Sequence, residues 1–163
     1  MYRSKDFYMK TIYNAKGKKL GSIKDIYVNL DKKIIDGFEV SNYSFLGKKN
    51  FLNTKDINYF EKDKVVGELS KGNGVKFSFF RNIDVVDCTG RLKGVVDDII
   101  VDEESYEIKG IAISPGIIEK VLKGKDIVLP NNIVVNEGYI LDVTPININF
   151  KNIWSKGINN EFY

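Results

Sequence analysis

Two aspartates, Asp25 and Asp98, occupy the same position in two related segments of the chain. A pair of carboxylates can share the roles of general acid and general base, so these residues are the first candidates for chemistry. The chain contains no histidine. Nucleophile activation by a Ser-His-Asp or Cys-His arrangement, proton shuttling by imidazole and histidine-ligated zinc or iron are therefore excluded.

A structural role explains Asp25 and Asp98 better than catalysis does. Each aspartate follows a glycine turn, at a point where the strand pattern slips by one residue. An aspartate in that place can accept backbone N–H groups that a bulge leaves unpaired. A contact to a partner is the second alternative and acid–base chemistry the third.

The remaining candidates also favour structural interpretations. The acidic run formed by Asp97, Asp98, Asp102, Glu103 and Glu104 lacks the oxygen spacing and the glycine of a calcium loop, and it is typical of a solvated strand edge and hairpin tip. Cys88 has no histidine to activate it, so we expect a passive thiol in an exposed turn. We therefore predict no catalytic residue, no cofactor and no metal site, and we do not expect an enzyme.

An internal repeat positions these residues. The segment from Gly17 to Ser41 aligns without a gap with the segment from Gly90 to Ser114, so that the numbering of equivalent residues differs by a constant amount. Eight aligned pairs are identical, where chance gives about one or two. Further along the chain the alignment shifts and pairs Ile57 with Ile133, which implies a longer loop in the second copy.

Each copy of the repeat is predicted to be β. The apolar runs are short, rich in Ile and Val, and separated by Gly, Asn and Asp, with glycines supplying positive φ in the hairpin turns. The apolar spacing contains an odd step near Asp25 and Asp98, and another beside Gly37 and Gly110. Such a step predicts a β-bulge, and repeated bulges favour a small closed barrel. The residues assigned to turns and bulges are Gly17, Gly21, Asp25, Gly37, Gly90, Gly94, Asp98 and Gly110.

Composition is that of a folded chain with uneven charge. The net charge is +3, but residues 1–74 hold 15 Lys/Arg and 9 Asp/Glu (+6), whereas residues 75–163 hold 10 and 13 (−3). The basic half could attract an acidic partner, including the other half of the chain. One cysteine, no signal-peptide pattern and no apolar run near the roughly 18 residues of a membrane span predict a cytoplasmic protein without a membrane span.

The repeated residues resemble the PRC-barrel family, which includes a cytoplasmic domain of the photosynthetic reaction centre H subunit and the C-terminal domain of a bacterial ribosome maturation factor. The shared pattern is a pair of glycines four residues apart, an apolar residue, an aspartate and a glycine in the third strand. The second copy, with Pro130 before a short helical turn, is similar to small sporulation-associated members from spore-forming bacteria. The first copy departs from the pattern, with Thr54 in place of that proline and Asn29 where an aspartate is usual.

Together these features predict an all-β chain of two tandem small bulged β-barrels with a short C-terminal extension. The predicted boundaries are 1–72 for the first copy, 73–144 for the second and 145–163 for the extension. Each copy alone has a thin core, so we expect an interface between the barrels with approximate two-fold symmetry. The oligomeric state is left open.

The resemblance implies non-catalytic domains that bind other macromolecules. We therefore predict a protein-binding adaptor, related to sporulation, whose partner the sequence does not name. The alternative, suggested by the basic first half and the ribosome maturation factor, is an RNA- or ribosome-associated factor. Aromatic, aliphatic and lysine side chains of two loops and of the extension are the candidate partner-binding residues, although they can equally pack inside the molecule. They are Tyr43, Phe45, Lys48, Lys49, Phe51, Ile117, Ile118 and Trp154.

Overall fold

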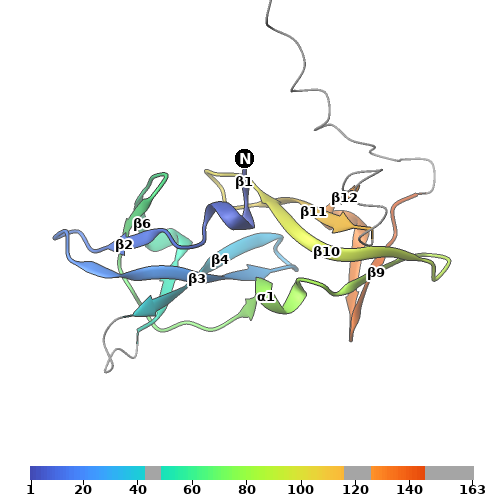
Figure 1. Cartoon of the computed structure of the whole chain (residues 1–163), viewed down its shortest axis with the longest axis horizontal. Helices are drawn as coiled ribbons and strands as arrows, with labels where there is room; N and C mark the ends of the chain where they lie inside the picture. Colours follow the sequence, from blue (N-terminus) through green and yellow to red (C-terminus); the bar gives the residue numbers. More distant parts are fainter. Residues whose placement is uncertain (43–48, 116–125, 146–163) are drawn as a thin grey trace, which may run out of the picture.

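The computed structural model describes residues 1–42, 49–115 and 126–145 and shows an all-β fold of two seven-stranded sheets (Figure 1). The first sheet contains β2 (Thr11–Tyr13), β3 (Lys19–Asn29), β4 (Ile34–Asn42), β5 (Phe51–Asn53), β6 (Ile57–Phe60), β7 (Lys64–Gly67) and β8 (Val75–Lys76). The second contains β1 (Tyr2–Arg3), β9 (Asp84–Asp87), β10 (Leu92–Val101), β11 (Ile108–Ser114), β12 (Asp126–Val128), β13 (Ile133–Asn136) and β14 (Tyr139–Asp142). Short helical turns are η1 (Ser4–Asp6), η2 (Thr54–Asp56), α1 (Phe77–Phe80) and η3 (Pro130–Asn132).

Each sheet is an open path of six strands with one further strand paired at its side. The strand order is β5-β4-β3-β2-β7-β6 in the first barrel and β12-β11-β10-β9-β14-β13 in the second. The two ends of each path are consecutive in the chain, since η2 joins β5 to β6 and η3 joins β12 to β13. The proline that begins η3 suits the first position of a helical turn, where its missing N–H has no partner to lose. The tandem barrels predicted from the repeat are confirmed.

The bends of the long strands fall at equivalent places in the two barrels. The register of β3 against β4 shifts between Ile23 and Asp25, and that of β10 against β11 shifts between Val96 and Asp98. A second shift lies between Tyr27 and Val28 and between Ile100 and Val101, opposite the strand glycines Gly37 and Gly110. These are the positions at which the apolar spacing predicts bulges, and they let one long strand wrap around a small core.

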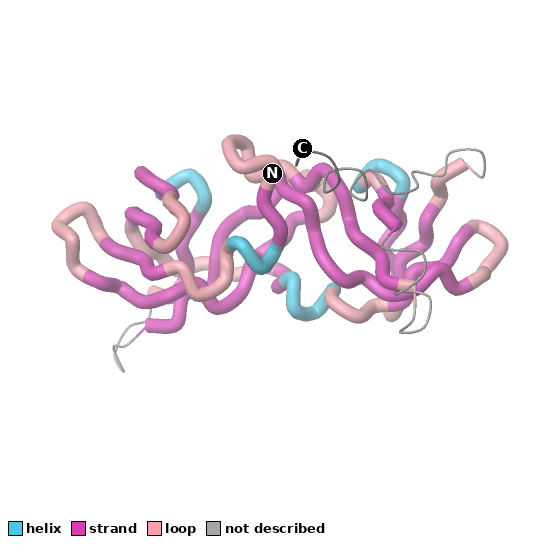
Figure 2. Tube along the Cα trace, turned by 45° about the horizontal axis from the view of Figure 1, so that its top comes forward, coloured by secondary structure: helices cyan, strands magenta, loops and turns pink. Residues whose placement is uncertain are grey.

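The two barrels exchange their first strands. The strand β1, which precedes the first barrel, pairs with β10 of the second barrel, with Tyr2 opposite Val101. The strand β8, which precedes the second barrel, pairs with β3 of the first barrel, with Val75 opposite Val28. Tyr2 and Val75 are equivalent in the repeat, as are Val28 and Val101, so the exchange is reciprocal. Figure 2 shows two helical turns in the middle of the molecule, where the exchanged segments lie.

A two-fold relation between the barrels is visible in the backbone pairing. Ile34 forms an antiparallel bridge with Glu107, which is its own equivalent in the second copy. The N–H of Ile35 donates to the carbonyl of Tyr106 over 2.9 Å, and the N–H of Ile108 donates to that of Lys33 over 2.7 Å. Exchanging the two copies converts each of these bonds into the other, which is the signature of a self-complementary interface built within one chain.

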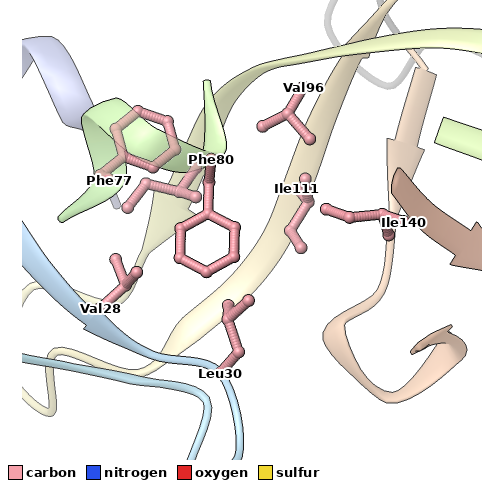
Figure 3. Close-up of a pocket in the computed structure, with 8 residues that line it drawn as sticks. Val28, Leu30, Phe77, Phe80, Val96, Ile111 and Ile140 are labelled. Atoms are coloured by element: carbon pink, nitrogen blue, oxygen red, sulfur yellow. The ribbon is translucent and has the colours of Figure 1, made fainter. Parts of the chain in front are cut away.

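Side chains from both copies fill the space between the barrels (Figure 3). Val28 and Leu30 reach in from the end of β3, and α1 contributes Phe77 and Phe80. Opposite them lie apolar residues of the second barrel, namely Val96, Ile99, Ile111 and Ile140. They leave a cavity of only about 10 Å³, at the lower limit for a single water molecule. These described side chains therefore belong to one continuous core, and the cavity between them is too small for a ligand.

Candidate interaction surfaces

Asp98 ties the second barrel to the N-terminus of the chain. Its side chain is only 8% exposed, and it accepts the N–H of Ile99 over 2.9 Å at the bulge. It also accepts the N–H of Ser4 over 2.9 Å and forms an ion pair of 2.7 Å with the guanidinium of Arg3. Because Arg3 and Ser4 belong to the exchanged segment, this carboxylate joins a bulge to an element of the other copy.

Asp25 has the equivalent role in the first barrel. It accepts the N–H of Ile26 over 2.8 Å, and its second oxygen accepts the hydroxyl of Ser78, in α1, over 2.5 Å. Burial and the carboxylate of Asp25 raise the pKa of the neighbouring Tyr8 to about 12, so this phenol stays protonated at neutral pH. Each aspartate thus lies in its own barrel, with its own donors. This arrangement fits a structural role rather than a catalytic pair.

Most residues proposed from sequence as partner contacts lie outside the described residues. These are Tyr43, Phe45, Lys48, Ile117, Ile118 and Trp154. Lys49 is exposed. Phe51 is only 6% exposed, packs against the ring of Tyr27 at 5.3 Å, and bonds through its backbone to Ser70. Because Phe51 is buried, its assignment to a binding surface is corrected. It packs inside the molecule, which was the alternative stated for this group of residues.

A row of apolar side chains on the outside of the second barrel was not predicted from the sequence. In β14 the side chains alternate, with Ile140 and Asp142 buried, so Tyr139, Leu141 and the following Val143 lie on the outer side. Leu141 lies opposite Val134 in β13 and opposite Val86 in β9. Val86 in turn lies opposite Leu92 in β10. We call the resulting set the outer apolar face: Val86, Leu92, Val134, Tyr139, Leu141 and Val143.

The outer apolar face is exposed and has an acidic border. Leu92 is 58% exposed and Val134 47% exposed. A shallow depression of about 580 Å³ opens between the two hairpin turns beside the face, with Tyr139 and Leu141 among its lining residues. Carboxylates also line this depression, from Asp84, Asp87 and Glu137. The surface therefore suits a segment that carries both apolar and basic side chains.

The first barrel presents different chemistry in the same place. Its strands pair in the same way, with Tyr13 opposite both Val66 and Lys19, and Val66 opposite Tyr59. Lys64 occupies the position of Tyr139, and Lys62 that of Glu137. We call this set the outer basic face: Tyr13, Lys19, Tyr59, Lys62, Lys64 and Val66. The barrel fold itself therefore tolerates charge at these positions.

Asp142 lies on the inner side of β14, beneath the outer apolar face. It is 2% exposed and forms an ion pair of 2.5 Å with Lys93, while the hydroxyl and N–H of Thr144 donate to its other oxygen. Burial by itself raises the pKa of Asp142, but the bonds from Lys93 and Thr144 together outweigh it. The pKa of this carboxyl therefore lies below its ordinary value.

Comparison with known proteins gives a match to one family. The model of the PRC-barrel domain matches twice, over residues 1–68 and 73–148. No curated protein matches the chain. Within the described ranges, no group of three or more acidic or cysteine side chains is arranged to hold a metal ion, and none of the helices has the length and apolar character needed to cross a membrane.

Proposed function

The chain belongs to the PRC-barrel domain family, and from this premise we propose that it is a non-catalytic adaptor that binds another protein through the outer apolar face of its second barrel. A sporulation-related role is proposed on the resemblance of the second copy alone. The partner segment is expected to carry apolar side chains with lysine or arginine beside them, because acidic residues border the face.

The observation that carries this proposal is the contrast between two equivalent surfaces of one chain. Leu92 and Tyr139 take the places of Lys19 and Lys64, although the strands pair identically. A contiguous apolar surface is unusual on a protein that does not use it, since solvation favours charged residues there. The buried aspartates, by contrast, are fully engaged in structural contacts.

The test is affinity capture with the whole chain and a Leu92→Lys variant. The substitution places on the second barrel the residue that the first barrel already carries, and Leu92 is exposed, so the fold is expected to survive. A protein captured by the native chain and lost with Leu92→Lys supports the proposal. The control is Tyr59→Ser, which removes an exposed aromatic side chain from the outer basic face of the first barrel and is expected to keep the captured protein. Equal recovery with all three chains would refute a role for the outer apolar face.

A second candidate function follows from the outer basic face. Two tyrosines beside three lysines form a surface on which bases can stack while ammonium groups attract phosphates. The ammonium group of Lys64 is held in an ion pair of 3.0 Å with Glu61, so a phosphate has to compete with that carboxylate. The surface supports an RNA- or ribosome-associated factor. Binding to ribosomal subunits would then weaken steeply with added salt, and the double variant Lys62→Glu/Lys64→Glu would abolish it. Failure to co-sediment with subunits at low salt would remove this candidate.

A further inference from the structure

The hairpin turns beside the two outer faces have the same hydrogen bonds but different charges. In the first barrel, the side-chain oxygen of Asn14 accepts the N–H groups of Lys16 and Lys18 over 3.1 and 2.9 Å. In the second barrel, a carboxylate oxygen of Asp87 accepts the two equivalent N–H groups over 2.9 and 3.0 Å. A neutral amide is therefore sufficient for this turn, and the fold does not require the negative charge of Asp87.

The surroundings of the two faces differ in the sign of their charge. Residues 11–19 and 61–64, beside the outer basic face, hold five lysines and two acidic residues, a net charge of +3. The equivalent residues 84–92 and 136–139, beside the outer apolar face, hold one arginine and three acidic residues, a net charge of −2. These charges attract each other and make the two faces electrostatically complementary.

The positive charge is concentrated in the hairpin between β2 and β3. In the hairpin between β6 and β7, Lys64 forms an ion pair with Glu61, so the lysines there are balanced by neighbouring carboxylates. Lys16 and Lys18, in contrast, project from an exposed turn. The first barrel therefore presents a basic hairpin at the edge of its outer face.

The outer basic face also has an apolar part. The side chain of Tyr59 is 51% exposed, and Tyr13 and Val66 beside it are partly exposed. Exposed tyrosine rings are well suited to pack against aliphatic side chains such as Leu92 on another surface. The face therefore matches the surface expected of a partner of the outer apolar face, which is apolar with basic residues beside it.

The two faces cannot meet within one molecule. The hairpin between β2 and β3 and the hairpin between β9 and β10 extend from opposite ends of its longest axis (Figure 1). A contact between the faces therefore needs a second copy of the chain. Because it joins two different surfaces, such a contact leaves one face of each kind open for further copies unless the assembly closes as a ring.

From these observations we infer that the outer basic face of one molecule binds the outer apolar face of a second copy, so that the chains associate head to tail. The inference rests on the proposed function, because it uses the same apolar face and names a partner surface for it. The apolar face crosses four strands, which at about 4.8 Å per neighbouring pair is about 14 Å wide. Contacts of this small size are typically weak and transient. We therefore expect association in concentrated solution and its loss on addition of salt.

The first test is the mass of the whole protein in solution, measured by sedimentation equilibrium between about 10 µM and about 500 µM. The average mass of the native chain should rise above that of the monomer as the concentration increases. Leu92→Lys, which alters the apolar face, and the double variant Lys16→Glu/Lys18→Glu, which alters the basic hairpin, should both stay monomeric. The control Lys5→Glu/Lys32→Glu has the same net charge as the double variant, changes exposed lysines outside both faces, and should associate as the native chain does. Circular dichroism identifies any variant that has lost its fold.

The second test mixes the two variants that do not associate. Leu92→Lys keeps the basic face and Lys16→Glu/Lys18→Glu keeps the apolar face, so one native contact can form between them. The mixture should therefore reach about twice the monomer mass and no more. A contact between two apolar faces predicts the opposite pattern, in which Lys16→Glu/Lys18→Glu associates by itself and mixing adds nothing.

Three outcomes overturn the inference: a native chain that stays monomeric, association that survives either variant, and variants that fail to pair when mixed. Affinity capture separates this inference from the proposed function. Leu92→Lys would still capture a second copy through its intact basic face, so a protein lost with this variant is a different partner. If such a protein is lost while the native chain is monomeric, the proposed function stands and only the second copy is wrong. A monomeric chain with unchanged capture refutes both.

Discussion

At the residue scale, Asp25 and Asp98 show how one side chain type serves a local and a distant purpose together. A bulge turns one backbone N–H out of the ladder, and the aspartate beside it accepts that group. The remaining lone pairs accept donors from the exchanged segment of the other copy. Repetition of the aspartate therefore follows from repetition of the bulge, without any need for catalysis.

Replacement of Asp98 by alanine tests this assignment. The change leaves the N–H groups of Ser4 and Ile99 without their partner in a buried place and removes the ion pair to Arg3. We expect the free energy of unfolding, measured with urea, to fall by roughly 2–4 kcal/mol. Glu104→Ala, in the exposed hairpin tip of the same barrel, should change it by less than about 0.5 kcal/mol. Equal effects of the two substitutions would contradict the structural role of Asp98.

The ion pair between Asp142 and Lys93 makes the free energy of unfolding depend on pH. Its pKa is lower in the folded protein than in the unfolded chain, so it binds a proton more readily when unfolded. The resulting stabilisation is present above the unfolded pKa, near pH 4, and disappears as the pH falls through the folded value. Between pH 6 and pH 3, urea midpoints of the native chain should therefore fall more than those of Asp142→Asn. Asp87 and Asp102, whose pKa values are also lowered, act equally in both proteins. Parallel curves would show that the pair contributes nothing.

At the element scale, the glycines of the hairpins differ in what they require. Gly17 has a φ of +76° and open space where a Cβ would lie, whereas a Cβ on Gly21 would lie 2.1 Å from the carbonyl oxygen of Ser41. Gly90 and Gly94 repeat the pattern, with a φ of +79° at Gly90 and a distance of 2.3 Å from a Cβ on Gly94 to the carbonyl oxygen of Ser114, but Gly94 also has a positive φ of +143°. The first glycine of each pair is needed for a turn, and the second for the close approach of two strands.

Alanine substitutions should separate these two requirements. In Gly17→Ala the added methyl group meets no neighbour, but the alanine has to adopt a left-handed backbone conformation. We therefore expect the free energy of unfolding to fall by about 1–2 kcal/mol. Gly21→Ala forces the backbone of β3 away from β4, and we expect roughly 3 kcal/mol or more. Thermal or urea unfolding measures both. In the second barrel Gly90→Ala repeats the first test, and Gly94→Ala should cost at least as much as Gly21→Ala because Gly94 also has a positive φ. A larger loss at Gly17 than at Gly21 would be the opposite of this expectation.

Much of each barrel could be predicted from the sequence, because apolar residues alternate along the long strands and the alternation shifts by one residue at each bulge. The odd apolar steps near Asp25 and Asp98 coincide with the register shifts of β3 and β10. The exchanged strands could not be predicted, since β1 and β8 have two residues each and are too short to show an alternation of apolar and polar residues. The outer apolar face was also missed. Its members lie on four strands and meet only through register, although the alternation of Tyr139, Leu141 and Val143 was a visible signal.

At the scale of the whole molecule, the exchange of first strands makes the two barrels one folding unit. The strand β1 belongs by chain order to the first barrel and by pairing to the second, and β8 has the reverse relation. The bridge between Ile34 and Glu107 and the shared apolar core add contacts that neither barrel has alone. If one copy unfolded alone, the sheet of the other copy would lose the strand that the unfolded copy contributes to it.

We therefore expect the described barrels to unfold in one transition, and a lesion in one to weaken the other. Hydrogen exchange should give similar free energies of opening for the amides of Val65 in the first barrel and Ile140 in the second, both of which are buried. Asp98→Ala should lower both by a similar amount, although Asp98 lies in the second barrel, because loss of β1 from β10 releases the segment that carries Phe7 into the first core. Asp25→Ala should do the same from the other side. If Asp98→Ala speeds exchange at Ile140 while Val65 keeps its protection, the barrels are independent and the exchanged strands only join them.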